Sequence, residues 1–398
     1  MHPTTDCRRL RPALAAAAAG VALLLAPAAA VRAQGTLSDQ GFGYPPGQLS
    51  ARALGQGGAN AETDAVTAVN PAALAGWGRA GLFFQYAPEL RQVSAGGKTD
   101  HTTTTRFPLV AAATPLFGRA TLGISSSTFL DRTFSTTRSA STPVDGGGSV
   151  NTTTSLSSTG AANDVRVAAA WAPSRSLSVG LGVHAFTGEN RVHVLVNVAD
   201  PGQSADVASP YLQVSEDRAL GFGGIGVSGG LEWRPVRSLQ VGASGRHGGT
   251  MRLTSGDTLL AKADVPDRFG VGLLYDGIPG TALSARYNWE GWSSMGDLGS
   301  PSLKAFDAVE YAAGADVSGP RLGSRTLLVR AGARTRTLPF AAAGQKVRET
   351  AFSGGFGVPL AVERVLMDLA VQRARRTASG VGASELAWTI GVGFTVRP

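Results

Sequence analysis

From about residue 79 onward, apolar and polar residues alternate along the chain with a period of two. In the last such segment Trp388, Ile390 and Val392 fall on one side, and Thr389 and Gly391 fall on the other. Side chains of a β-strand point alternately to its two faces, so this pattern predicts strands with one apolar face. We count about fourteen such segments, near residues 79–88, 106–115, 117–128, 163–172, 176–187, 218–233, 237–247, 267–276, 280–290, 307–317, 324–335, 350–360, 364–374 and 386–396.

The connections between these segments alternate between short turns and long loops. PLFG, PSRS and RPVRS are short, whereas 129–162, 188–217, 248–266 and 291–306 are long. A soluble β-sandwich would show the same alternation along its strands, but it has no reason to sort its loops by length. Short turns on one side, long loops on the other and an even strand count are typical of bacterial outer-membrane barrels. We therefore predict an all-β protein, a transmembrane antiparallel β-barrel of about 14 strands.

Aromatic residues lie at both ends of the predicted strands. Trp171 and Trp233 belong to the same turn written twice, W-x-P-x-R-S-L, and they lie with Tyr275 at short-turn ends. A second group lies at the long-loop ends: Tyr86, Phe269, Trp289, Trp292 and Trp388. Two such rows are expected where a barrel wall crosses the two membrane interfaces. The alternative is that each Trp packs on its own hairpin.

The first 33 residues have the layout of a secretory signal peptide. Three arginines precede an apolar run that ends near Leu25, and small residues continue to Ala33. Cleavage after Ala33 would also remove Cys7, the only cysteine. The mature chain would then have no thiol chemistry and no cysteine metal site. A retained membrane anchor is the alternative.

Charge and motifs give no sign of catalysis or of nucleic-acid binding. The 36 Lys and Arg outnumber the 28 Asp and Glu, but the arginines are scattered and form no basic cluster. GFGGIG and GVSGG match nucleotide-binding and nucleophile patterns, yet both lie within one alternating strand and no helix follows them. The histidines of the mature chain are dispersed, without metal-ligand spacing. We predict no enzyme, no cofactor, no metal site and no nucleic-acid partner.

The small-residue stretch 50–75 before the first strand, SARALGQGGANAETDAVTAVNPAALA, resembles the FadL/TodX family of outer-membrane transporters for hydrophobic compounds. The resemblance rests on the run from Ala53 to Gly58, on Asp64 and on Asn70-Pro71-Ala72, which we call the Asn-Pro-Ala box. A second similarity is SARYNWEGWSSM, residues 284–295, which is similar to the family's W-x-x-W-S strand end.

Between the predicted signal peptide (1–33) and the predicted barrel (78–398), this resemblance implies a small hatch (34–77) that plugs the lumen. It places Asn70, Pro71 and Ala72 in the hatch, near a kink in the third strand (117–128) that opens the wall. It also implies passive uptake of fatty acids or of aromatic or aliphatic hydrocarbons, with exit sideways into the membrane. Independently of any family, a barrel this wide must hold something in its lumen. A disordered periplasmic tail is the alternative for the hatch.

If the Leu, Val and Trp faces contact lipid, the opposite faces point into the lumen. These faces carry Phe83, Gln85, Arg166, His184, Phe186, Arg246, Arg286, Arg330, Arg334 and Asp368. The candidates for ligand contact are Phe83, Phe186, Arg246, Arg286 and Arg330, because an inward Arg among aromatic rings can hold a carboxylate. The alternative is a structural charge ladder in which Arg166, Arg330 and Asp368 join Glu232 and Asp316. The loop run RVHVLVNV, residues 191–198, is either an apolar landing site or a strand extended above the membrane.

We expect a monomer in the outer membrane, in contact with membrane lipid and with a hydrophobic small-molecule ligand. The outer-membrane barrel assembly machinery recognises an aromatic residue at the end of a barrel. Here four residues follow the last aromatic residue, Phe394, and we expect Phe394 to take that role. Two other functions stay open. One is a protein-interaction barrel, like the PorV-type shuttles of secretion systems, and the other is a general porin.

Overall fold

The computed structural model of the protein describes residues 43–95, 98–144, 148–199, 212–298, 304–322, 325–342, 344–360 and 364–397. The predicted signal peptide, its cleavage site and the first residues of the predicted hatch lie outside these ranges. None of the described helices has the length and apolar content needed to cross a membrane.

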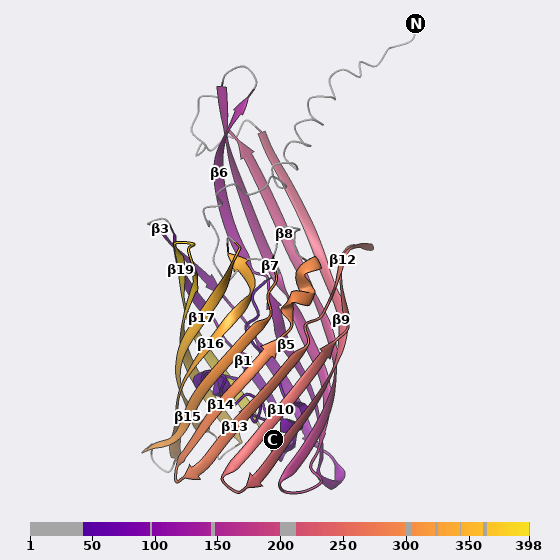
Figure 1. The fold of residues 1–398 in the computed structure, drawn as a ribbon, viewed down its shortest axis with the longest axis vertical. Helices are drawn as coiled ribbons and strands as arrows, with labels where there is room; N and C mark the ends of the chain where they lie inside the picture. The colour runs from indigo at the N-terminus through magenta and orange to yellow at the C-terminus, as the bar shows by residue number, and fades with distance from the viewer. Residues whose placement is uncertain are drawn as a thin grey trace. The chain divides into compact units, whose positions relative to one another are not determined.

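The described chain forms one antiparallel sheet that closes on itself, because the first strand pairs with the last (Figure 1). Its strands are β1 (Gly81–Tyr86), β2 (Glu89–Ala95), β3 (Lys98–Thr104), β4 (Leu109–Pro115), β5 (Ala120–Asp131), β6 (Phe134–Val144), β7 (Gly148–Trp171), β8 (Leu177–Val198), β9 (Leu212–Val236), β10 (Leu239–Gly248), β11 (Thr250–Ser255), β12 (Thr258–Asp264), β13 (Arg268–Ile278), β14 (Thr281–Glu290), β15 (Ala308–Leu322), β16 (Arg325–Ala342), β17 (Gln345–Leu360), β18 (Val365–Ala378) and β19 (Ala383–Val396).

The 19 strands cross the wall as fourteen passes. Five passes consist of two strands each, namely β1 with β2, β3 with β4, β5 with β6, β10 with β11, and β12 with β13. Subtracting these five from 19 gives the predicted fourteen, so the barrel prediction is confirmed. Short helical turns complete the described elements: α2 (Ala51–Gly55), η1 (Pro71–Trp77), η2 (Phe117–Arg119) and η3 (Trp292–Leu298).

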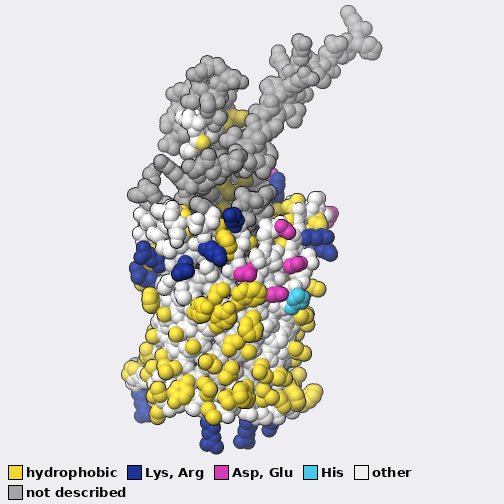
Figure 2. Space-filling view, viewed as in Figure 1, with side chains coloured by type: hydrophobic (Ala, Val, Ile, Leu, Met, Phe, Trp, Pro, Cys, Tyr) yellow, Lys and Arg dark blue, Asp and Glu magenta, His cyan; other side chains and the backbone are white. Residues whose placement is uncertain are grey.

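Burial alternates along the strands as the sequence pattern predicts. In β1, Phe83 and Gln85 are buried at 1% and 2% exposure, whereas Leu82 and Phe84 are exposed at 59% and 48%. All ten side chains that were expected in the lumen are buried. On the face shown in Figure 2 the exposed apolar side chains form a yellow band, with charged side chains of both signs above it and Lys and Arg side chains below it. Such a band is the surface that a barrel presents to lipid.

The long connections between passes are more regular than predicted. β7 pairs with β8 as far as Thr152↔Val198, and β6 pairs with β7 over its whole length. The prediction of a loop was therefore wrong for most of 129–162 and for 188–198. Residues 148–158 carry Ser and Thr on both faces, so no apolar face marks this stretch as a strand, but paired neighbours still satisfy its backbone groups. Residues 191–198 are a strand extension.

One member of the predicted aromatic belts was assigned wrongly. Trp292 begins η3, and its side chain is only 1% exposed within a buried cluster. The chain leaves the wall after Glu290, so the two-residue alternation no longer determines which way the following side chains point. Trp171, Trp233 and Trp388 remain exposed on the outside, at 54%, 49% and 43%.

Candidate functional site: a hatch and an aromatic cluster in the lumen

The described N-terminal residues, 43–77, lie inside the barrel, and we call them the hatch. α2 packs against β17, β18 and β19, and η1 packs against β7, β8 and β9. Ser50 caps α2, because its Oγ accepts a hydrogen bond from Ala53 N (3.0 Å), and the same hydroxyl donates to Asp64 (2.5 Å). The predicted hatch within the lumen is thus confirmed for these residues. Its predicted start at residue 34 stays a prediction.

The Asn-Pro-Ala box starts the second helical turn of the hatch. Asn70 Oδ1 accepts from Ala72 N (3.0 Å), which makes Asn70 the N-cap of η1, and Pro71 takes the first helical position. The Asn70 side-chain amide donates to Glu62 O (2.8 Å) and to Leu231 O in β9 (3.2 Å). Asn70 therefore ties the hatch to itself and to the wall.

Glycines in the wall make room for the box. A Cβ on Gly230 would lie 1.9 Å from Asn70 Oδ1, and a Cβ on Gly180 would lie 2.4 Å from Ala72 N. No other residue type fits at these distances without displacing the box. The Gly-rich inner face thus receives the hatch at β8 and β9.

A buried carboxylate holds the middle of the hatch. Glu62 has 0% exposure and forms ion pairs with Arg268 and with Arg286 (3.2 Å), while Ser244 donates to it (2.6 Å). Arg286 also pairs with Glu310 on β15 (2.6 Å). An ion pair buried this fully breaks at a high cost, because removing one partner leaves the other charge uncompensated.

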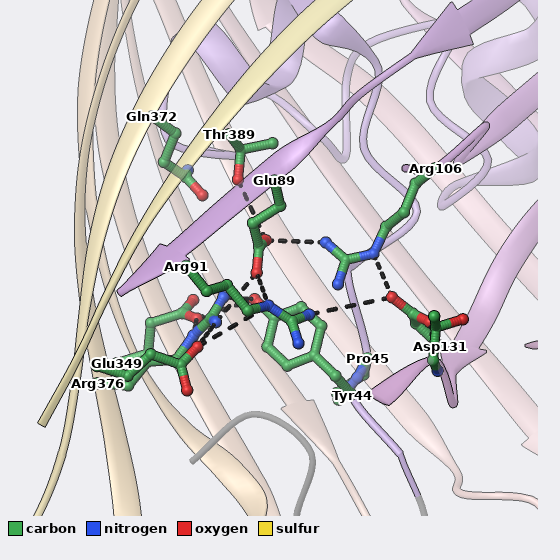
Figure 3. A network of polar contacts seen from close by, with 12 residues as sticks. Tyr44, Pro45, Glu89, Arg91, Arg106, Asp131, Glu349, Gln372, Arg376 and Thr389 are labelled. Atoms are coloured by element: carbon green, nitrogen blue, oxygen red, sulfur yellow. Dashed lines mark hydrogen bonds and ion pairs between the residues drawn. The ribbon is translucent and has the colours of Figure 1, made fainter. Parts of the chain in front are cut away.

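Tyr44 lies at the centre of a network of arginines and acids (Figure 3). Its ring lies 4.3 Å from the Arg376 guanidinium and 5.2 Å from that of Arg106. Its hydroxyl donates to Glu349 (2.9 Å) and accepts from Arg336 (2.5 Å) and from Arg376 (2.7 Å). Burial raises the pKa of the Tyr44 hydroxyl above its usual value, so it stays a neutral donor.

Tyr44 also joins the hatch to the third pass of the wall. Tyr44 and Asp131 exchange backbone hydrogen bonds of 2.8 and 2.9 Å at the end of β5. The Asp131 carboxylate also accepts from Arg106 (2.5 Å) on the second pass. At this level β3 pairs with β2, and β6 pairs with β7. Tyr44, Arg106 and Asp131 therefore connect the second and third passes where strand pairing no longer does.

The third pass is irregular close to this point. The pairing of β5 with β7 shifts register between Thr128 and Leu130. The predicted kink in segment 117–128 falls next to this shift, at the outer end of β5. Whether it opens a lateral exit stays a prediction.

An aromatic cluster occupies the part of the lumen on the long-loop side of the box. The Phe129 ring lies 4.9 Å from that of Phe186 and stacks on Trp292 at 5.1 Å. The Arg246 guanidinium lies 5.3 Å from the Phe129 ring and 5.4 Å from the Phe186 ring. Phe222, Met251, Leu253 and Met295 extend the cluster. Apolar side chains thus gather inside a barrel whose other inward side chains are largely polar.

Arg246 is only partly paired. Its Nη1 lies 3.6 Å from the Asp164 carboxylate, and its Nη2 donates to Pro266 O (3.3 Å). Among the described residues its buried Nε has no hydrogen-bond partner. A donor is therefore left beside the two phenylalanine rings.

The five predicted ligand-contact residues do not form one site. Phe186 and Arg246 meet in the aromatic cluster, whereas Phe83 belongs to another buried cluster, with Leu74 and Trp77 of the hatch. Arg286 is bound by Glu62 and Glu310, as described above. Arg330 pairs with Asp316 (3.2 Å) and Asp368 (2.5 Å), as the charge-ladder alternative expected for these three residues. Glu232 instead accepts from Ser178 (3.3 Å).

Sequence reasoning did not single out Phe129 or Tyr44, and it assigned Trp292 to the outer aromatic belt. Phe129 shares its strand face with Ser125 and Ser127, so an aromatic residue on a polar face was the available signal. Tyr44 carries no comparable signal, because its partners come from strands far apart in the sequence.

A cavity of about 50 Å³ lies between the aromatic cluster and the hatch. Phe129, Arg246 and Trp292 line it from one side, and Gln48 and Leu49 line it from the other. An engineered cavity of about 150 Å³ accommodates benzene. The cavity is therefore too small for even a small aromatic ligand while the hatch is seated.

Comparison with known proteins identifies the fold through solved structures. A scan against protein-family models and a search of curated proteins found no match. Among solved structures, a Pseudomonas aeruginosa FadL homologue aligns with TM-score 0.57 and 12% identity, over 89% of this chain and 99% of that one. The chain has the FadL-type fold. Two further solved structures align in the same way. The Ralstonia pickettii toluene transporter TbuX has TM-score 0.54 and 18% identity, over 88% of this chain and 98% of that one. The Pseudomonas putida toluene transporter TodX has TM-score 0.53 and 14% identity, over 88% of this chain and 98% of that one.

The FadL-type fold confirms the architecture that the N-terminal residues implied. The alignments cover 88–89% of this chain and 98–99% of the compared chains, so the likeness extends over the whole barrel fold. At these identities the likeness concerns the fold alone.

Proposed function

We propose that this barrel lets hydrophobic small molecules diffuse passively across the bacterial outer membrane. The observation that carries the proposal is the aromatic cluster of Phe129, Phe186 and Trp292, which faces the lumen and not the lipid. A lumen built to pass water or ions would have polar side chains there. The compared structures include two toluene transporters and a monoaromatic hydrocarbon channel, and these descriptions support the same class of ligand.

The ligand class that the cluster suits is an aromatic or aliphatic hydrocarbon or a fatty acid. Stacked rings at about 5 Å offer apolar contact without a directional polar requirement. The Nε of Arg246 adds one donor beside these rings, which favours a ligand with a carboxylate among otherwise apolar groups. Comparing a fatty acid with a neutral hydrocarbon would separate these two cases.

The hatch acts as the barrier in this proposal. Because the cavity of about 50 Å³ beside the aromatic cluster is smaller than such a ligand, binding at this place requires the hatch to shift within the lumen. We assign the release to the Asn-Pro-Ala box, Asn70, Pro71 and Ala72, which contacts the wall at Gly180 and Gly230. We place the exit beside β5, where the register shift lies and where Tyr44 and Asp131 meet.

Uptake in whole cells tests the proposal. Cells that lack other channels of this fold would express the wild type, Trp292→Ala or Trp171→Ala, and accumulation of radiolabelled toluene and oleate would be measured. Trp171 is the matched control, because it is an exposed Trp on the outer surface of the wall. We expect uptake by the wild type and by the Trp171 variant, and a loss of at least tenfold for Trp292→Ala.

The two alternative functions predict other results. A protein shuttle would purify with a stoichiometric protein partner and would show no uptake above the empty vector. A general porin would conduct ions with the hatch in place and would pass sugars as readily as hydrocarbons. Either result would overturn the proposal.

A further inference from the structure

In the last four passes the described acids all point into the lumen, where arginines pair with them, and the charged side chains on the outer face are cations. In the described parts of β16 to β19 the acids are Glu349, Asp368 and Glu385, and all three point inward with exposures of 0%, 3% and 0%. The charged side chains on the outer face of the same described strands are all cations. Ion pairing therefore stabilises the inside of this part of the wall and leaves the outside with a net positive charge.

Three exposed arginines form the centre of the outer charge. Arg373 and Arg375 lie two residues apart on β18, and Arg348 lies across from Thr377 on the neighbouring strand β17. Arg348 is therefore diagonal to Arg375, at about 7–8 Å, and Arg373 is the next residue after Arg375 on the same face of β18. None of the ion pairs found among the described residues involves these three arginines. We call Arg348, Arg373 and Arg375 the arginine patch.

The arginine patch lies at the edge of the apolar band. Arg373 is paired with Trp388 on β19, and its guanidinium lies 5.8 Å from the indole ring. On the short-turn side of the patch the outer face continues with Phe352, Val371 and Ile390, which are exposed at 64%, 44% and 41%. The patch itself is close to the long-loop ends of β17 and β18.

Arg375 lies between two like charges, and these charges repel one another unless anions lie among them. At the depth where an aromatic belt ends, the available anions are the head groups of the outer leaflet. Arginine binds phosphate through two parallel N–H···O bonds, and it is weakly hydrated, which suits an interface. The apolar side chains next to the patch would contact the acyl chains of the same molecule.

We propose that the arginine patch binds the phosphate groups of an outer-leaflet lipid that carries more than one phosphate. The lipid lies with its acyl chains against Phe352, Val371 and Ile390 and with its phosphates on Arg348, Arg373 and Arg375. This contact is separate from the lumen and does not depend on which molecule the barrel transports.

Binding of purified lipid A to the detergent-solubilised barrel tests the proposal. Diphosphoryl and monophosphoryl lipid A would be titrated into the wild type, into Arg373→Gln/Arg375→Gln and into Arg175→Gln/Arg237→Gln, with native mass spectrometry as the readout. The second double variant is the control, because it removes the same charge from exposed positions at the short-turn end of the barrel. Heat-modifiable migration on gels checks that each variant is folded.

The expected loss follows from the strength of such contacts. Each Arg near a membrane surface contributes about fivefold to the binding of anionic lipid, so losing two arginines weakens diphosphoryl lipid A binding about 30-fold. The control variant binds as the wild type does, and monophosphoryl lipid A binds more weakly to the wild type. Equal binding by both double variants, or equal binding of the two lipids to the wild type, would overturn the proposal.

Discussion

Glu62 offers the sharpest test of how the hatch is held. Its carboxylate is fully buried and contacts Arg268, Arg286 and Ser244, which belong to β13, β14 and β10. The change Glu62→Gln keeps the size and shape of the side chain but removes its charge. Two buried guanidinium groups then lose the anion that compensates them at this point.

The magnitude follows from the burial of this pair. Removing one partner of a buried ion pair costs about 3 kcal/mol at the lower end of the known range, which corresponds to about 100-fold in an equilibrium. The wall keeps its own backbone pairing, so this cost falls mainly on the seated position of the hatch. We therefore expect the displaced hatch to become about 100-fold more populated.

Single-channel recording in planar bilayers measures this population as the fraction of time spent in a conducting state. The control is Glu216→Gln, which removes an exposed acid that pairs with Arg218 at the surface. Such exposed pairs contribute about 0–1 kcal/mol, so this variant should conduct as the wild type does. If folded Glu62→Gln barrels conduct no more often than the control, the carboxylate does not hold the hatch.

Two further changes test other contacts of the hatch. Gly230→Ala would place a Cβ 1.9 Å from Asn70 Oδ1, whereas Gly229→Ala would place one 3.9 Å from Leu181 on the outer face. Ion conductance should rise for the first variant only, and equal conductance would show that the box does not rest on this glycine. Tyr44→Phe removes one hydrogen bond to Glu349 and two from arginines, each worth about 1.5–3 kcal/mol, so amides around residue 44 should exchange faster in hydrogen-exchange mass spectrometry. Unchanged protection there would contradict the assigned role of the hydroxyl.

The wall could be predicted from the sequence because lipid on one side imposes a strict alternation. Leu82 and Phe84 must face outward, and Phe83 and Gln85 then face the lumen, so each pass also fixes its own inner surface. For the extended part of β8, up to Val198, the sequence left open an apolar landing site in a loop and a strand extension. This part of β8 lies beyond the apolar band, and there the environment does not distinguish the two faces of a strand.

The turn at the box could also be predicted, since Asn70-Pro71-Ala72 suits a capped turn among small residues, and the family resemblance implied its location in the lumen. The wall residues that contact the hatch could not be predicted. Glu62 meets Arg268 across 206 residues of sequence, and Tyr44 meets Arg376 across 332. Such pairs depend on how fourteen passes close into a ring, and alternation within one pass contains no information on this.

A disulfide between hatch and wall tests the central claim, that the hatch must move for hydrophobic molecules to pass. The Cβ of Ala51 lies 3.8 Å from a Cβ placed on Gly391, which is within the range for disulfides. The control joins Ala370 to Gly391, wall to wall, with a corresponding distance of 3.7 Å. Toluene and oleate uptake would be measured for Ala51→Cys/Gly391→Cys and Ala370→Cys/Gly391→Cys, oxidised and then reduced.

We expect oxidation to stop uptake through the hatch-to-wall variant, reduction to restore it, and the wall-to-wall variant to transport in both states. Equal uptake by the oxidised and reduced hatch-to-wall variant would contradict the account.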